Sequence, residues 1–336
     1  MKAVVERKDG QTVIKMPEGR PLRILQLTDI HIGGGVLSRK KDKAALAAVE
    51  KIVRASDADF IVVTGDMVYP MFMFTGTGNN LKASKMFGET MDRLGVPWTF
   101  TFGNHDEEII AYYKKDRLAD YYMTLKSCYF DKGDGKLTGV GNHCIRVEKA
   151  DGTPVTLLMM IDSNMYCGKG FFSGFDVIHD DQIDWYEDEV RRQSAGGELL
   201  PSMAFFHIPP KEFKEGWEKC YRGEPDAEYY SGFVGEKDNY FGYPKTKEGS
   251  FFRRMVAFGS CKAMFMGHDH LNTLSIKYKG IRLTYGMSID YLAYMKIMGQ
   301  IPTAKCNTQR GGTLIDIACD GSFDIKMLPL SDIERK

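Results

Sequence analysis

Short apolar runs that each end in a small polar motif recur along this chain and restrict the folds open to it. Five such motifs occur, and four of them contain histidine. They are Asp29-Ile30-His31, Gly65-Asp66-Met67-Val68-Tyr69, Gly103-Asn104-His105-Asp106, Phe206-His207-Ile208-Pro209 and Gly267-His268-Asp269-His270. The second motif contains an aspartate and no histidine. Each apolar run is a predicted β-strand, and ligands bind outside the carboxyl ends of strands in α/β sheets. The motifs are therefore predicted to meet at one edge of a sheet.

The segments between the motifs alternate in hydrophobic period between strand and helix. Strands are predicted at residues 22–27, 59–64, 97–102, 155–161, 203–206, 263–266, 273–278, 281–285, 313–317 and 323–327. Helices are predicted at residues 42–54, 81–94 and 180–193, and Asp106 is predicted to cap another through residues 107–110. Strand–helix alternation early in the chain and hairpin-like strands at its end predict mixed sheets.

The residue types of the motifs suit a pair of metal ions. Two cations about 3.5–4 Å apart can clamp the attacking and leaving oxygens of an in-line displacement. Imidazole together with carboxylate favours Mn, Fe, Zn or Ni, whereas an all-oxygen set favours Mg or Ca. One carboxylate must bridge the ions, and an asparagine oxygen adds a ligand without adding charge. The candidate ligands are Asp29, His31, Asp66, Asn104, His207, His268 and His270.

Composition indicates an ordinary globular protein. The chain has 336 residues, of which 43% are hydrophobic and 27% charged, and we expect one domain over residues 1–336. Its core is predicted at about residues 22–328, with an aromatic-rich insertion at about 213–252. Lys+Arg and Asp+Glu balance at 45 each, so no overall attraction for nucleic acid or for an anionic membrane is expected. No apolar run approaches the length of a membrane span.

Cysteine usage bears on the compartment. The seven cysteines are dispersed and include no C-x-x-C pair, which argues against a zinc ribbon or a disulfide framework. A reducing compartment is the simpler interpretation. The first seven residues contain no apolar signal region, so a cytoplasmic location is expected. A secreted protein whose signal had been removed would look the same, so that alternative stays open.

The complete motif set resembles the calcineurin-like metallophosphoesterase superfamily. The motifs D-x-H, G-D, G-N-H-D, H and G-H-x-H occur in the family's order from about residue 22 to residue 270. The resemblance implies an α/β protein, a four-layer α/β/β/α sandwich of two mixed β-sheets with the metal site at the carboxyl ends of the strands. It also implies two divalent or mixed-valence metal ions as cofactors.

Roles for single residues follow from the same resemblance. The first ion would be bound by Asp29, His31 and His270. The second would be bound by Asn104, His207 and His268, and Asp66 would bridge the two. His105 would contact the phosphate and assist the leaving oxygen, while Asp106 would orient His105.

One motif is also similar to that of the purple acid phosphatases. Gly65-Asp66-Met67-Val68-Tyr69 matches their G-D-x-x-Y, in which the tyrosine binds ferric iron. That group normally has glycine at the position of His31, so His31 and Tyr69 compete for one ligand position. We favour His31, because Tyr69 precedes Pro70 and can pack in the loop.

The expected activity is hydrolysis of a phosphate ester by in-line attack of a metal-bridging hydroxide. A phosphomonoesterase acting on a phosphorylated small molecule or a phosphoprotein is the leading hypothesis. A phosphodiesterase acting on cyclic nucleotides or lipid head groups is the alternative. A non-catalytic scaffold is disfavoured, because such relatives typically lose the pair that Asn104 and His105 form here.

Other features have both a structural and a functional interpretation. His143 and His179 lie outside the motifs and are expected to be structural or solvent-facing. Residues 162–164 form a predicted turn that could instead support the site. The aromatic residues between 217 and 252 either line the pocket or pack within a long loop.

Overall fold

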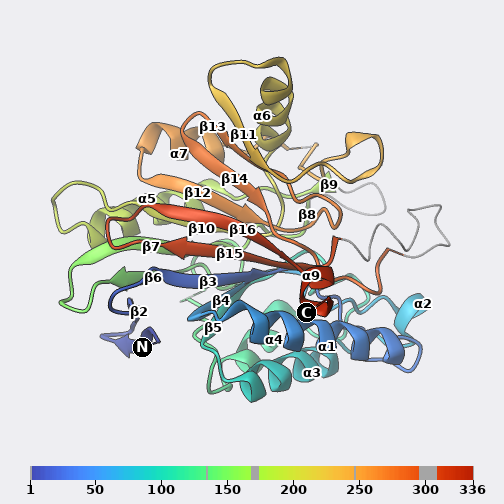
Figure 1. The fold of residues 1–336 in the computed structure, drawn as a ribbon. Helices are drawn as coiled ribbons and strands as arrows, with labels where there is room; N and C mark the ends of the chain where they lie inside the picture. The colour runs from blue at the N-terminus through green and yellow to red at the C-terminus, as the bar shows by residue number, and fades with distance from the viewer. Residues whose placement is uncertain (1, 134, 168–173, 246, 295–308, 336) are drawn as a thin grey trace.

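The computed structural model describes residues 2–133, 135–167, 174–245, 247–294 and 309–335. Within them, strands form two large sheets and a short hairpin (Figure 1). The larger sheet has the order β1 (Val4–Lys8), β2 (Gln11–Lys15), β6 (His143–Glu148), β7 (Pro154–Met160), β10 (Ser202–Phe205), β12 (Cys261–Met266), β14 (Ile281–Tyr285), β13 (Ser275–Tyr278) and β11 (Ala227–Ser231). The smaller has the order β16 (Phe323–Pro329), β15 (Gly311–Ile317), β3 (Leu22–Leu27), β4 (Phe60–Thr64) and β5 (Trp98–Thr101). The hairpin is β8 (Tyr166–Cys167) with β9 (Gly174–Phe175).

Helices cover the outer faces of the two sheets (Figure 1). The smaller sheet packs on α1 (Arg39–Ser56), α3 (Asn80–Leu94), α4 (Lys115–Tyr122) and α9 (Leu330–Glu334). The larger sheet packs on α5 (Asp180–Gln193), α6 (Lys211–Arg222) and α7 (Phe251–Phe258). The short helices α2 (Phe72–Thr75) and η1 (Lys237–Asn239) lie in loops. The predicted four-layer α/β/β/α sandwich is confirmed.

Alternating side chains on the strands build the separate cores. Leu25 and Ile61 face the helices, whereas Ile24 and Val62 face the other sheet. All four are fully buried. Because successive side chains of a strand point to opposite faces, a wholly apolar strand can contribute to two cores at once. Runs such as Phe60–Thr64 therefore lie between two layers.

Strand direction places the five motifs at one end of the sandwich. β3, β4 and β5 are parallel to one another, and β7, β10, β12 and β14 are also joined by parallel pairing. The Gln26 amide links the two sheets, since its Nε2 donates to Thr64 Oγ1 at 2.9 Å and to the Met266 carbonyl at 3.1 Å. The loops that follow β3, β4 and β12 are therefore held against one another.

The predicted helices at 42–54, 81–94 and 180–193 are confirmed as α1, α3 and α5. The helix predicted through residues 107–110 is wrong, because those residues form turns and α4 begins only at Lys115. The Asp106 carboxylate accepts hydrogen bonds from the amides of Asp66 and Val68 in the loop after β4 and of Gly103 in its own loop, so it caps no helix here. Glu107 instead accepts from the Lys115 amide at 2.7 Å, at the start of α4.

Several elements were not predicted from the sequence. The hairpin of β1 and β2 extends the larger sheet with strands that precede residue 22. The segment 213–252 contains most of α6 and the edge strand β11, which pairs with β13, so it is not a long structureless loop. Its status as an insertion stays a prediction. Among the described helices, none combines the length and apolar character that crossing a bilayer requires.

Candidate metal centre

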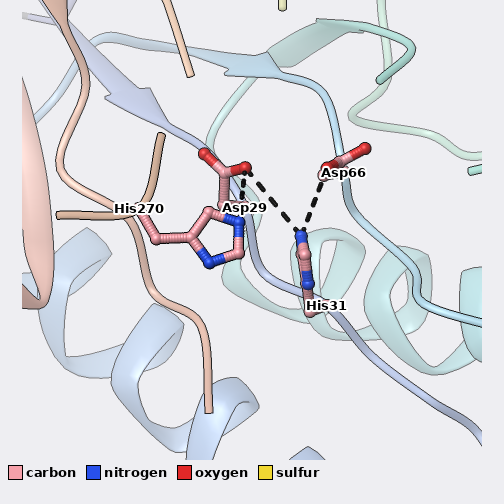
Figure 2. A group of neighbouring side chains, drawn as sticks. All are labelled: Asp29, His31, Asp66 and His270. Carbon is pink, nitrogen blue, oxygen red and sulfur yellow. Dashed lines mark hydrogen bonds and ion pairs between the residues drawn. The ribbon is translucent and has the colours of Figure 1, made fainter. Parts of the chain in front are cut away.

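Four predicted ligands from three loops converge at the strand ends, as Figure 2 shows. His270 Nε2 lies 3.3 Å from Asp29 Oδ1, and His31 Nε2 lies 3.3 Å from Asp66 Oδ2. His31 Nε2 is also 3.8 Å from Asp29 Oδ1. One ligand atom from each residue lies within 4.8 Å of the other three, and all four residues are buried. Ligand atoms that share one ion, each bonded to it at about 2.0–2.2 Å, are separated from one another by distances similar to those given above.

A second cluster shares Asp66 with the first. Its other members are His207, from the loop after β10, and His268, from the loop after β12. His207 Nε2 lies 3.1 Å from Asp66 Oδ2, and His268 Nδ1 lies 3.3 Å from His207 Nε2. One carboxylate thus belongs to two adjacent groups of possible ligands, which is the arrangement that a bridging ligand requires.

Asn104 supplies a direct test of whether these residues fit a metal. Its amide nitrogen donates to the Tyr166 hydroxyl at 3.0 Å. Its Oδ1 is buried and has no hydrogen-bond partner among the described residues. A buried polar atom without a partner is costly, unless a group absent from the protein chain satisfies it. The oriented, unpartnered oxygen fits a metal ligand, as predicted from the motif.

The backbone that presents the ligands is unusual. Asp29, His31, Asp66 and His268 have φ values of 51°, 57°, 52° and 79°. Residues other than glycine rarely adopt this left-handed region, and such strained residues cluster at functional sites. Hydrogen bonds between the loops hold the conformation, for example from the His31 amide to the Asp66 carbonyl at 3.0 Å. At Gly103, a Cβ would overlap the Asp66 carboxylate, so only glycine fits there.

The outer ring nitrogens of two histidines have hydrogen-bond partners that set ring orientation. His207 Nδ1 lies 2.8 Å from the Thr64 carbonyl oxygen, so Nε2 faces the cluster. The Asp290 carboxylate is hydrogen-bonded to His270 Nδ1 at 3.3 Å and also lies 3.6 Å from His31 Nδ1, which is within ion-pair range but too long for a hydrogen bond. Such partners fix the tautomer of a metal-binding histidine and increase its basicity.

Asp290 was missed in the sequence, although it is buried beside the predicted ligands. Its carboxylate accepts hydrogen bonds from the amides of Leu292 and Ala293 at 2.7 Å and of Tyr294 at 2.9 Å. It follows β14 by five residues, so the rule that polar residues after strands reach the site would have found it. It was overlooked because no family motif contains it.

His105 also has a partner that the sequence did not reveal. Its Nδ1 is hydrogen-bonded to the Glu108 carboxylate, which also lies 3.4 Å from the Tyr166 hydroxyl. The carboxylate of Asp106 accepts from the amides of Gly103 at 2.7 Å and of Asp66 at 3.1 Å. These contacts are with backbone amides and not with the His105 ring, so the role of Asp106 in orienting His105 stays a prediction. Asp106 joins the loops after β4 and β5.

Charges within the cluster shift the pKa values in opposite directions. Burial raises the pKa of Asp66, but the charges of His207 and His105 outweigh it and hold that pKa well below its usual range. Burial lowers the pKa of His207, but Asp66 outweighs it and raises that pKa to about 9. Burial and the charge of His207 lower the pKa of His268 to about 3. Bound cations would balance the carboxylates without these protons.

Tyr69 lies against the cluster rather than apart from it. Its ring stacks on His31 at a centroid distance of 5.1 Å and meets the edge of His105 at 4.8 Å. Burial and the nearby charge of Glu108 raise its pKa, which favours the neutral phenol. The stacked ring is consistent with packing in the loop, and the choice of His31 over Tyr69 as ligand stays a prediction.

Residues outside the motifs support the loops that carry the ligands. Ser163 Oγ accepts from the amides of His207 at 3.2 Å and Ile208 at 3.0 Å, so the stretch after β7 supports the site. The Asp269 carboxylate accepts from the Gly242 amide at 2.9 Å and from the Tyr285 hydroxyl at 2.6 Å. The aromatic-rich segment therefore contacts the His268 loop through its backbone.

The aromatic side chains of that segment divide between core and surface. Phe213, Phe241 and Phe251 are buried in the core of the larger sheet, whereas Tyr221 and Tyr229 are exposed. Phe175 of the β8–β9 hairpin, outside the segment, meets His268 edge-on at 4.4 Å. Neither of the two interpretations from the sequence, lining of the pocket or packing within a long loop, describes the whole segment.

The two histidines expected to lie outside the site do so. His143 is buried between Thr99 Oγ1 at 2.8 Å and the Gly141 carbonyl at 2.7 Å. His179 precedes α5 and lies 3.0 Å from Asp176.

Comparison with known proteins shows which proteins this chain resembles. The model of the calcineurin-like phosphoesterase family matches residues 22–272. The chain is 24% identical over 302 residues to "Probable inactive purple acid phosphatase 29" of Arabidopsis thaliana, covering 82% of this chain and 73% of that protein. It is 27% identical over 289 residues to "Phosphatase DCR2" of Saccharomyces cerevisiae, covering 80% of this chain and 47% of that protein. A dimetal phosphatase from Danio rerio has a similar fold, with a TM-score of 0.55, 10% identity, and coverage of 92% of this chain and 97% of that one.

Proposed function

Because the chain belongs to the calcineurin-like phosphoesterase family, we propose that it hydrolyses phosphoric esters with two bound metal ions. The observation that carries the proposal is the pair of clusters that share the buried Asp66, all of whose members are buried except the partly buried His268. Scattered structural carboxylates and histidines would not be brought within 4.8 Å of one another twice at the same strand ends. A phosphomonoester is the preferred substrate class.

The two clusters and Asn104 divide into two ligand sets. One set is Asp29, His31 and His270, the other is Asn104, His207 and His268, and Asp66 belongs to both. When bound, two cations would lower the pKa of a water molecule and neutralise charge on the phosphoryl oxygens. Mn, Fe, Zn and Ni are the candidate metals, since imidazole and carboxylate together suit each of these.

We propose that His105 moves a proton at the substrate. Its side chain is 24% exposed, while its amide donates to Asp66 Oδ1 at 2.8 Å. Because Glu108 holds Nδ1, Nε2 is the nitrogen left to give a proton to the leaving oxygen. Glu108 is thus a positioning residue, and Asp106 acts through the backbone that carries Asp66 and Asn104.

No serine or cysteine occurs in an activating motif, so a covalent intermediate is not expected. Attack of water in line with the leaving group inverts the configuration at phosphorus. A substrate chiral at phosphorus tests this, and net retention would exclude a single displacement.

Two other activities compete with a phosphomonoesterase. A phosphodiesterase for cyclic nucleotides or lipid head groups would use the same ligands. A scaffold without activity is suggested by the name of the Arabidopsis relative, which describes it as probably inactive. This chain keeps Asn104 and His105 together with all other predicted ligands, which supports an enzyme.

Purified protein loaded separately with Mn, Fe or Zn should bind about two ions per chain. Paired assays with an aryl phosphate and a bis-aryl phosphate then compare monoester with diester hydrolysis. Faster turnover of the monoester supports the leading proposal, and faster turnover of the diester supports the alternative. If the protein binds no metal and hydrolyses neither ester, the non-catalytic scaffold is the remaining interpretation.

A further inference from the structure

Three loops next to the candidate metal centre expose large apolar side chains. They follow β3, β4 and β5, the strands that end at Asp29, Asp66 and Asn104. Val36, Met73 and Ile109 are 81%, 79% and 82% exposed. We define the apolar rim by Val36, Leu37, Phe72, Met73, Ile109 and Tyr112, which are all exposed.

Backbone contacts join the three loops into one surface. The Leu37 amide donates to the Thr75 carbonyl at 3.2 Å, which ties the first loop to α2. The Tyr112 amide donates to the Gly78 carbonyl at 2.9 Å, which ties the third loop to the second. The surface adjoins the candidate centre, because Ile109 directly follows Glu108 in the chain.

Basic residues flank the apolar rim. Arg39, Lys40 and Lys43 are exposed in the first turns of α1, directly after Leu37. Lys82 and Lys85 are exposed near the start of α3. None of the five forms an ion pair within the described part of the chain. The amino-terminal ends of both helices add positive partial charge at the same place.

We propose that the apolar rim and its flanking basic residues dock on an anionic lipid bilayer. Apolar side chains beside Lys and Arg match an interface that has anionic head groups above acyl chains. The rim also protrudes, since Phe72 and Met73 begin the short α2 at the edge of the molecule (Figure 1). A helical partner protein would instead require a groove. With a net charge of zero, the attraction depends on this local cluster.

Sedimentation with vesicles tests the proposal. Phosphatidylcholine vesicles with and without phosphatidylserine are compared at low and high salt. The wild-type chain should bind the anionic vesicles, less so as salt increases. Val36→Ser with Phe72→Ser and Met73→Ser should weaken binding at least about tenfold. Tyr221→Ser on α6, where the side chain is 84% exposed, is the matched control and should bind as wild type.

Charge variants provide a second, independent measurement. Arg39→Gln with Lys40→Gln should weaken binding by roughly fivefold per residue and flatten the salt dependence. Lys8→Gln with Lys277→Gln, on exposed positions of β1 and β13, is the matched control and should change neither. Both sets are exposed, and circular dichroism checks that each variant folds.

Three outcomes would overturn the inference. The first is equal binding to neutral and anionic vesicles, and the second is equal binding by rim and control variants. The third is dimerisation that the rim variants abolish without vesicle binding, which would assign the surface to a second copy. This inference goes beyond the proposed function and fails separately from it. If the chain hydrolyses aryl phosphate but does not bind vesicles, the proposed enzymatic function stands and the lipid inference fails. If His105→Ala binds vesicles without hydrolysing the ester, the lipid inference stands independently of the activity.

Discussion

The two halves of the candidate metal centre are held in different ways. In the first half, the Asp290 carboxylate contacts both His31 and His270. In the second half, the partners are uncharged, since the Thr64 carbonyl contacts His207 and the Tyr166 hydroxyl contacts Asn104. A carboxylate makes a histidine a stronger ligand than a carbonyl does. The first half should therefore bind a cation more tightly than the second.

The halves share one electrostatic feature despite this difference. Each contains one histidine with a raised pKa, His270 in the first and His207 in the second, because a carboxylate outweighs burial at both. Each also contains one with a lowered pKa, His31 or His268, where burial prevails. The histidines of the two sets are thus similar, but the first set contains the Asp29 carboxylate where the second contains the neutral Asn104 amide. The contrast between the halves therefore lies both in the ligands and in the groups behind them.

The largest effect is expected where the halves meet. Asp66→Ala removes the carboxylate that belongs to both clusters, so metal content should fall from about two ions toward zero, and hydrolysis should fall to background. Elemental analysis and a turnover assay measure the two losses. Retention of two ions would contradict the assignment of Asp66 to both halves.

The next largest effect is expected on the rate of hydrolysis and not on the metal content. His105→Ala should lower kcat by about 10²–10⁴-fold through loss of proton transfer, with metal content unchanged. Turnover is compared with elemental analysis on the same samples. Loss of metal would instead show that His105 supports the ligands.

Glu108→Gln provides the companion measurement to His105→Ala. The amide can keep one hydrogen bond but not the charge, so kcat should fall by less than in His105→Ala. Asp106→Asn serves as its matched control, since Asp106 contacts backbone amides. If Asp106→Asn alone reproduced the kinetic effect of His105→Ala, the original assignment of Asp106 would be supported.

A smaller effect should separate the halves directly. Asp290→Asn should weaken one of two metal-binding steps by about 10–100-fold and leave the other unchanged. Calorimetric titration resolves the two steps. Ser163→Ala is the matched control behind His207, where only a hydroxyl is lost. Equal weakening of both steps by Asp290→Asn would remove the contrast between the halves.

The smallest effect concerns a buried histidine outside both halves. Burial lowers the pKa of His143 from 6.5 to about 4, so the folded state stays neutral where the unfolded state binds a proton. Folding stability should therefore be unaffected above pH 6.5 and fall as pH decreases toward 4, by on the order of 3 kcal/mol.

Urea unfolding of metal-free protein measures this slope. His143→Gln should flatten it. If the slope is unchanged in His143→Gln, burial of His143 does not cause the loss of stability at low pH.

Much of the sandwich could be predicted because its signals are local. Leu22–Leu27 and Phe60–Thr64 are apolar runs whose length and composition indicate buried strands. The helix through residues 107–110 failed for a different reason. Asp106 has the side chain of a helix cap, but the amides of Gly103 and Asp66 compete for its oxygens. Local propensity could not anticipate that competition.

The order of residues in the chain was enough to indicate the family, the layered fold and the candidate ligands, because every ligand follows a strand within a few positions. The pairings behind the ligands were decided only when the loops met. Asp290 contacts His31, and Glu108 rather than Asp106 contacts the His105 ring. Such contacts depend on side-chain rotation and on loops distant in the chain, and neither has a periodic signal in the sequence.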